Sequence, residues 1–171
     1  MSEPATEFTR LVPLGRLGSE PFRRHLAASE AERAALARRF DLLSLDRLEA
    51  DIELVREIGG TILLSATFAA DFAQECIVTL DPVAGSVNAR FQLRYGPPEA
   101  EETAPAGEDD PAFEPLHGEV INIGEAVAQE FSLSLPPFPR SPDAVIEMAA
   151  PDETDEGPFA ALARFRRGEP H

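Results

Sequence analysis

The residues best suited to catalysis or metal binding are one cysteine and three histidines, and they lie far apart in the chain. They are Cys76, His25, His117 and His171. A metal site needs several converging His, Cys or carboxylate ligands, and the sequence has no HxxxH or CxxC spacing. The sequence therefore predicts surface histidines, a cysteine packed in the core, and no catalytic residue, metal or cofactor.

The sequence also lacks the motifs of common enzyme classes. Gly59-Gly60 is a turn pair rather than a phosphate-binding GxxxxGK[ST] loop, and there is no GxSxG nucleophile motif. No flanking pattern supports a nucleophile pair of Cys76 and His117. An enzyme with Cys76 as nucleophile is therefore the least favoured hypothesis.

Carboxylates are abundant and unevenly distributed. The net charge is −16, all 15 basic residues are arginine, and residues 99–156 alone contain sixteen acids and one arginine. The run Glu108-Asp109-Asp110 lacks the spacing of a calcium loop. Such a segment repels nucleic-acid phosphates and attracts basic proteins, although acidic segments also serve simply to keep proteins soluble.

Four segments show the patterns of β-strands. In Val87–Tyr95 apolar and polar residues alternate strictly, which is typical of a half-buried strand. Similar patterns cover 48–58, 61–68 and 74–80, and 81–85 is expected to be a turn. Short links between consecutive strands favour an antiparallel meander.

Helical patterns flank these strands. Ser29 and Glu32 fit a capping box at the start of a helix over 29–40. A second helix is predicted over 124–135, ended by Pro136-Pro137, and a short amphipathic helix over 158–167. Extended segments are expected at 8–14 and 118–123.

These elements predict a single α+β domain over residues 1–171. Its antiparallel sheet of four or more strands is packed by two or three helices, and the aperiodic acidic segments 96–116 and 140–157 are expected to be flexible. No apolar run is long enough to cross a membrane, and MSEPATEFTR is not a secretory signal. A cytoplasmic protein is expected.

Three motifs, in order, resemble one known family. The segment QECIVTLDPV resembles the family's E-C-x-x-C strand and turn. The segment GEVINIGEAVAQEFSLSLPPFP resembles its G-E segment, acidic helix and L-P-x-x-P exit. The segment GPFAALARF resembles its closing N-P-F-A-x-L motif. The family is YceD, the large ribosomal RNA subunit accumulation proteins. The residues that carry the resemblance are Cys76, Gly118, Glu119, Glu125, Glu130, Pro136, Pro139, Pro158 and Phe159.

The sequence departs from the family at its cysteines. Thr79 stands where many relatives have a second cysteine, and RSPDAVIEM lacks the later one. If those cysteines bind zinc in relatives, this chain cannot use the same site, and Cys76 is expected to remain as a buried residue.

The resemblance implies a non-enzymatic role in accumulating large-subunit ribosomal RNA. Together with the charge distribution, it leads to the hypothesis that the chain binds a basic ribosomal protein or assembly factor. The alternative is a direct RNA-binding module. It would use the arginines Arg90, Arg94, Arg164 and Arg166.

Overall fold

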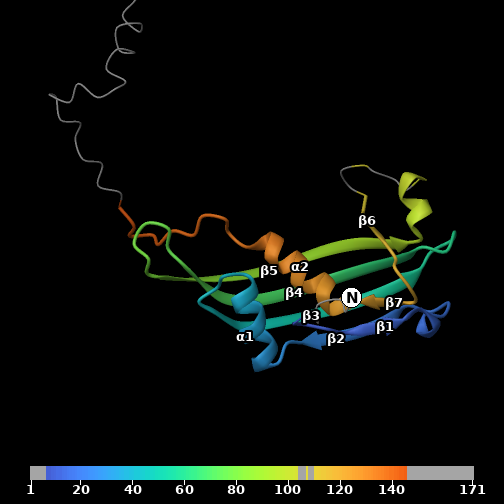
Figure 1. Cartoon of the computed structure of the whole chain (residues 1–171), viewed down its shortest axis with the longest axis horizontal. Helices are drawn as coiled ribbons and strands as arrows, with labels where there is room; N and C mark the ends of the chain where they lie inside the picture. Colours follow the sequence, from blue (N-terminus) through green and yellow to red (C-terminus); the bar gives the residue numbers. More distant parts are fainter. Residues whose placement is uncertain (1–6, 104–106, 108–109, 146–171) are drawn as a thin grey trace, which may run out of the picture.

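The computed structural model describes residues 7–103, 107 and 110–145. A five-stranded sheet in the order β2-β3-β4-β5-β6 forms its centre, and β1 pairs with β7 in a smaller sheet (Figure 1). The strands are β1 (Leu11–Pro13), β2 (Phe22–Ala27), β3 (Ser44–Arg56), β4 (Ile62–Glu75), β5 (Pro82–Gly96), β6 (Ala112–Pro115) and β7 (Val120–Asn122). The helices are α1 (Glu30–Arg39) and α2 (Ile123–Ser134), with 3-10 turns η1 (Leu14–Arg16) and η2 (Pro98–Thr103). The α+β prediction is confirmed.

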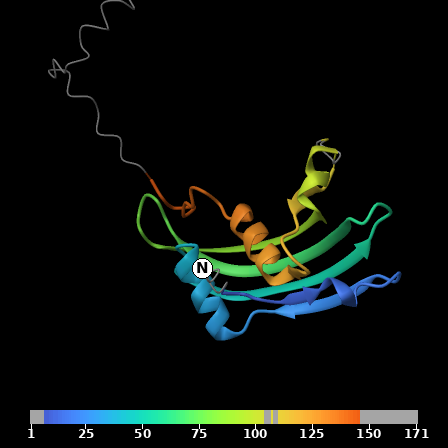
Figure 2. The same ribbon diagram turned by 45° about the vertical axis from the view of Figure 1, so that its right-hand side comes forward.

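The long strands β3, β4 and β5 form the predicted antiparallel meander. Their alternating patterns bury one face of the sheet and leave the other in contact with solvent. The predicted division of β5 is confirmed, because Phe91 packs edge-on against the buried Phe68 while Arg90 and Gln92 lie on the opposite face. The sheet curves, and α2 lies on its concave side (Figure 2).

Helix α2 supplies the centre of the core through Phe131, which is fully buried. The ring of Phe131 meets those of Phe40, Phe72 and Phe68 edge to face, at centroid distances of 5.9, 5.7 and 6.5 Å. These partners come from the end of α1 and from β4. One side chain therefore joins both helices to the sheet.

Both predicted helices begin at specific caps. At α1 the capping box is complete, because Glu32 N donates to Ser29 Oγ and Ser29 N donates to Glu32 Oε2. At α2 the side chain of Asn122 accepts hydrogen bonds from Glu125 N and from Arg10 N. The second bond ties β1 to the start of α2. No helix in the described part of the chain has the length and hydrophobicity needed to span a membrane.

The prediction of a strand over 74–80 and a turn over 81–85 is wrong. Strand β4 continues to Glu75, and the connection to β5 is the turn 76–81, closed by hydrogen bonds between Cys76 N and Asp81 O and between Leu80 N and Cys76 O. The apolar composition of CIVTL resembles that of a strand, but its backbone N–H groups bond within the turn, except that of Ile77, which bonds to the segment after α2. Residues 82–85 pair with β4 instead.

Two strands, β2 and β6, lie in segments without a strand pattern. Strand β2 pairs antiparallel with β3, and His25 lies on it rather than in a loop, although it is exposed as predicted. Strand β6 pairs parallel with β5. Together with η2, it gives regular structure to part of the segment 96–116. Residues 146–157 and the predicted tail helix, with Pro158, Phe159, Arg164, Arg166 and His171, lie outside the described residues.

Candidate functional site

Cys76 lies at a junction of two of the sequence motifs. Its side chain is fully buried, as expected. Its Sγ accepts hydrogen bonds from the backbone N–H groups of Val78 and Thr79, both at 3.5 Å, and of Ser141 at 3.4 Å. Ile77 N also donates to Pro139 O at 3.0 Å. The turn after β4 and the proline exit after α2 are therefore held together around one sulfur atom.

These donors change the acidity of the thiol. Hydrogen bonds from the Thr79 hydroxyl and from the N–H groups of Ser141 and Thr79 lower the pKa of Cys76 to about 6, since they favour the thiolate over the thiol. Thiolates are reactive when reagents can reach them, but this sulfur is enclosed. The site is therefore structural, and within the described residues no three His, Cys, Asp or Glu side chains gather to hold a metal ion.

We expect Cys76→Ala to destabilise the protein in a pH-dependent way. The pKa of Cys76 in the folded state lies below the ordinary value of 9.0, so the thiolate stabilises the folded protein fully when the pH is above 9.0. This contribution is lost as the pH falls from about 9 to about 6. Urea unfolding of both proteins across this range measures it. A stability difference that stays constant between pH 6 and 9 would contradict a buried thiolate, and Cys76→Ser is the near-isosteric control.

Glu125, in the second motif, has a structural partner. Its two carboxylate oxygens accept hydrogen bonds from Arg39 Nη1 and Nη2 at 3.0 and 2.7 Å, and Arg39 also contacts Glu7. The pair raises the pKa of Arg39. Because Arg39 belongs to α1 and Glu125 to α2, this bidentate ion pair ties the two helices together. Glu125 is thus committed to the fold rather than free for a partner.

Glu130 has the opposite environment. Burial, and then the nearby carboxylate of Glu114, raise the pKa of Glu130. Burial and both of these carboxylates raise the pKa of Tyr95 as well. The three side chains come from α2, β6 and β5. Among the described residues, no ion pair includes Glu114 or Glu130. We call Glu114 and Glu130 the acidic pair.

The other motif residues shape the chain around these groups. Gly118 has φ +92°, a conformation that glycine adopts readily, and it precedes β7. Glu119 is exposed, and its carbonyl accepts a hydrogen bond from Leu14 N. The carbonyl of Pro136 accepts one from the side chain of Gln74.

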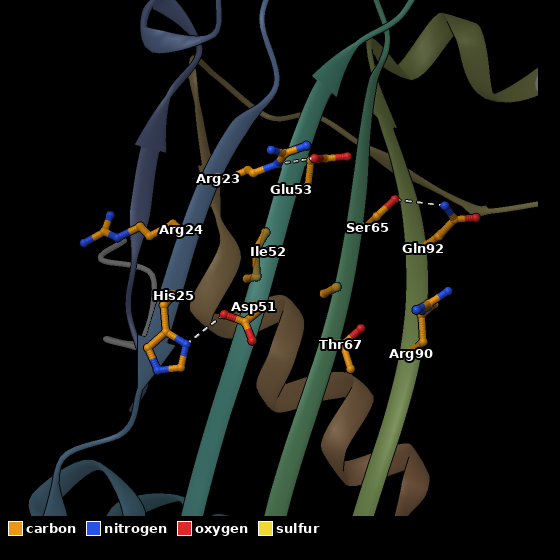
Figure 3. A pocket seen from close by; sticks show the side chains of 11 residues that line it. Arg23, Arg24, His25, Asp51, Ile52, Glu53, Ser65, Thr67, Arg90 and Gln92 are labelled. Carbon is orange, nitrogen blue, oxygen red and sulfur yellow. Dashed lines mark hydrogen bonds and ion pairs between the residues drawn. The ribbon is translucent and has the colours of Figure 1, made fainter.

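A separate open groove of about 540 Å³ crosses the solvent face of the sheet. Figure 3 shows its polar side chains, with Arg23 bonded to Glu53, and His25 to Asp51. Arg90 projects into the same groove, and among the described residues it has no carboxylate within 4 Å. The groove is therefore mixed in charge, with Arg90 as an available cation.

Arg94 differs from Arg90 although both lie on β5. Its Nε and Nη2 donate to the carboxylate of Glu57 at 2.8 and 3.3 Å, and its side chain is only 17% exposed. This ion pair neutralises the charge of Arg94. The two β5 arginines of the RNA-binding alternative therefore do not form one cationic surface.

The comparison with known protein families shows to which family the chain belongs. The family model described as large ribosomal RNA subunit accumulation protein YceD matches residues 64–166. The chain belongs to the YceD family. The matched region contains the Cys76 turn, the acidic pair and the tail motif, whereas β2 and β3, which form half of the groove, precede it. No match was found among curated proteins or among solved structures.

The YceD description links the chain to the accumulation of large-subunit ribosomal RNA. The structure brings the turn of Cys76 together with Pro139. It gives the two glutamates of α2 different environments, because Glu125 pairs with Arg39 whereas Glu130 lies near the carboxylate of Glu114. Sequence reasoning missed Glu114 and Tyr95 because the strand patterns do not reveal that β6 pairs with β5 and sets Glu114 opposite Tyr95. It missed Ser141 because a backbone N–H donor leaves no mark in the sequence.

Proposed function

We propose that this YceD-family protein is a non-enzymatic cytoplasmic factor that supports accumulation of large-subunit ribosomal RNA by binding a basic ribosomal protein or assembly factor. The acidic pair is the observation that supports this proposal. Two half-buried carboxylates that repel each other, and to which no described residue supplies a cation, are stabilised when a partner inserts an arginine or lysine between them.

The net charge of the segment that contains the acidic pair favours the same kind of partner. The described residues after Gly96 include exposed or half-exposed Glu99, Asp110, Glu119 and Asp143. Arg140 is the only arginine in the described part of this region. A field of one sign steers an oppositely charged protein to the surface and raises its association rate. This charge opposes binding of RNA by the same segment.

Removing the acidic pair is expected to release the partner. In Glu114→Gln/Glu130→Gln, a charge pair with the partner is lost, and such losses cost about 2–5 kcal/mol at interfaces, or about 30-fold or more in affinity. Affinity purification of the tagged wild-type and variant proteins, followed by mass spectrometry, measures the recovery of basic proteins. Glu119→Gln, which removes an exposed carboxylate of the same region, is the matched control.

Ribonuclease treatment of the purified complexes distinguishes protein binding from direct RNA binding. The observation that favours direct RNA binding is the free Arg90 in the groove. If the partner is a protein, its recovery survives ribonuclease treatment and depends on the acidic pair. Recovery of ribosomal RNA alone, lost on ribonuclease treatment and reduced by Arg90→Gln, would overturn the proposal in favour of the RNA-binding alternative. In that case the affinity would also fall steeply with salt.

The single variant Glu130→Gln is expected to stabilise the free protein. Because the pKa of Glu130 is raised in the folded state, its ionised form costs stability at neutral pH, and this cost disappears as the pH falls through that pKa. Glu130→Gln should therefore increase the free energy of unfolding at pH 7 by a few tenths to about 1 kcal/mol. Urea unfolding at pH 7 and at pH 4 tests this prediction. A destabilised variant at pH 7 would show that Glu130 is a structural residue.

A further inference from the structure

Exposed apolar side chains gather at the end of the sheet where the described chain ends. Ile77 and Leu80, in the turn after β4, are 52% and 66% exposed, and Phe138 and Val145, in the segment after α2, are 74% and 76% exposed. In Figures 1 and 2 the two segments lie side by side. We call these four side chains the end patch. Exposed apolar clusters of this kind mark interaction surfaces.

The two segments of the end patch form one surface because hydrogen bonds join them. Ile77 N donates to Pro139 O, and Ser141 N donates to the sulfur of Cys76. The same two segments contain three exposed carboxylates, Glu75, Asp81 and Asp143, and one exposed arginine, Arg140, so their net charge is negative. An occupant of this surface would therefore combine an apolar face with basic side chains.

The segment 158–167 of the same chain has this composition. Phe159, Leu162 and Phe165 recur every three residues, a spacing that would put them on one side of the helix predicted from the sequence, and Arg164, Arg166 and Arg167 provide the basic groups. The matched YceD region extends through this segment to residue 166. The YceD description does not say where the segment binds.

The length of the intervening chain permits the contact. Thirteen residue steps separate Val145 from Pro158, and an extended chain spans up to about 3.3–3.6 Å per residue, so the segment reaches a patch that lies beside Val145. A tether of this length gives an effective concentration in the millimolar range. Even a weak contact would then be well populated.

We propose that residues 158–167 dock onto the end patch of their own chain. Phe159, Leu162 and Phe165 cover the apolar side chains of the patch, and the arginines face the carboxylates of the two segments that form it. This inference is independent of the acidic pair, which lies at the β6 side of the sheet. Its failure would leave the proposed function intact.

A spin label on the tail of the full-length protein tests the docking. The label is attached at Ala163→Cys, where it reacts selectively because Cys76 is fully buried. We expect it to broaden the amide resonances of residues 77–80 and 138–145 and to leave those of the distant β3–β4 turn, at Ile58, unchanged. Equal or absent broadening at the two ends would overturn the proposal.

Variants of the full-length chain identify the contacts. Replacing Phe159, Leu162 and Phe165 by serine should abolish the broadening and speed hydrogen exchange at residues 77–80 by about tenfold or more. Phe138→Ser should weaken the broadening, and Ile58→Ser, at an exposed apolar residue outside the patch, should not. The opposite ranking of the two single variants would overturn the proposal.

A mixture separates docking within one chain from docking between two. In this experiment, chains that carry the spin label but no nitrogen-15 are mixed with chains that carry nitrogen-15 but no spin label. Docking within one chain then leaves the observed amide resonances sharp. Broadening of residues 77–80 in this mixture would assign the contact to a second copy and overturn docking within the chain.

Discussion

Replacing Phe131 by alanine is expected to lower the free energy of unfolding by about 3–5 kcal/mol. The side chain is fully buried and contacts three other aromatic rings, from α1 and β4. Its removal leaves a cavity between α2 and the sheet, and the surrounding elements are too regular to close it. The loss would be a large part of the 5–15 kcal/mol that stabilises a typical domain.

Chemical unfolding followed by circular dichroism measures this effect. Phe131→Leu retains most of the apolar volume and should cost less than half as much. Ile58→Ala, at a side chain exposed beyond β3, should change stability by no more than about 0.5 kcal/mol. A loss of less than about 1 kcal/mol for Phe131→Ala would contradict the central position of this ring.

Adding a single methyl group at Gly124 is expected to destabilise the protein by about 3 kcal/mol or more. A Cβ atom at this position would come within 2.2 Å of the carbonyl oxygen of Phe8 and within 3.1 Å of Arg10 N. Both contacts are with backbone atoms, so neither side can yield by rotating a side chain. The first turn of α2 and the segment before β1 would have to separate.

Helix propensity predicts a change in stability of the opposite sign, so the experiment distinguishes the two effects. Alanine in a helix interior is favoured over glycine by about 1 kcal/mol, so propensity alone predicts that Gly124→Ala stabilises the protein. The steric contact predicts the opposite sign. Gly18→Ala, where an added Cβ meets no atom within 4 Å, is the control, and it should be neutral or stabilising by up to about 1 kcal/mol. Stabilisation by Gly124→Ala, measured by the same unfolding experiment, would refute the close approach.

The acidic pair and the Cys76 turn show two different uses of unusual electrostatics. At Cys76, donors from three residues compensate the buried charge, and the group stabilises the fold. At Glu130, no cation in the described part of the chain compensates the negative charge. The ionised carboxylate therefore lowers the stability of the free protein until a cation binds beside it. Perturbed carboxylates of the second kind are typical of binding sites. For this reason the proposed partner surface is the acidic pair rather than the surroundings of Cys76.

The sequence by itself determined the local elements of this protein. The capping box at Ser29 and Glu32 fixed the start of α1, and the alternation in Val87–Tyr95 fixed which face of β5 is buried. The apolar spacing before Pro136 predicted α2. Each of these signals is contained within a few consecutive residues, because a helix turn and a strand pleat have short periods.

Only the tertiary structure decided which distant residues meet. The pairing of β6 with β5 sets Glu114 opposite Tyr95, on which Glu130 of α2 also acts, and the turn 76–81 brings Cys76 to the N–H group of Ser141. The approach of Phe8 to Gly124 likewise joins residues far apart in the chain. Periodicity reports whether a side chain is buried, but not what it is buried against, since its partner depends on packing between elements. For that reason the sequence indicated the family and the fold class, while the charged groups available to a partner emerged from the packing of α2 against the sheet.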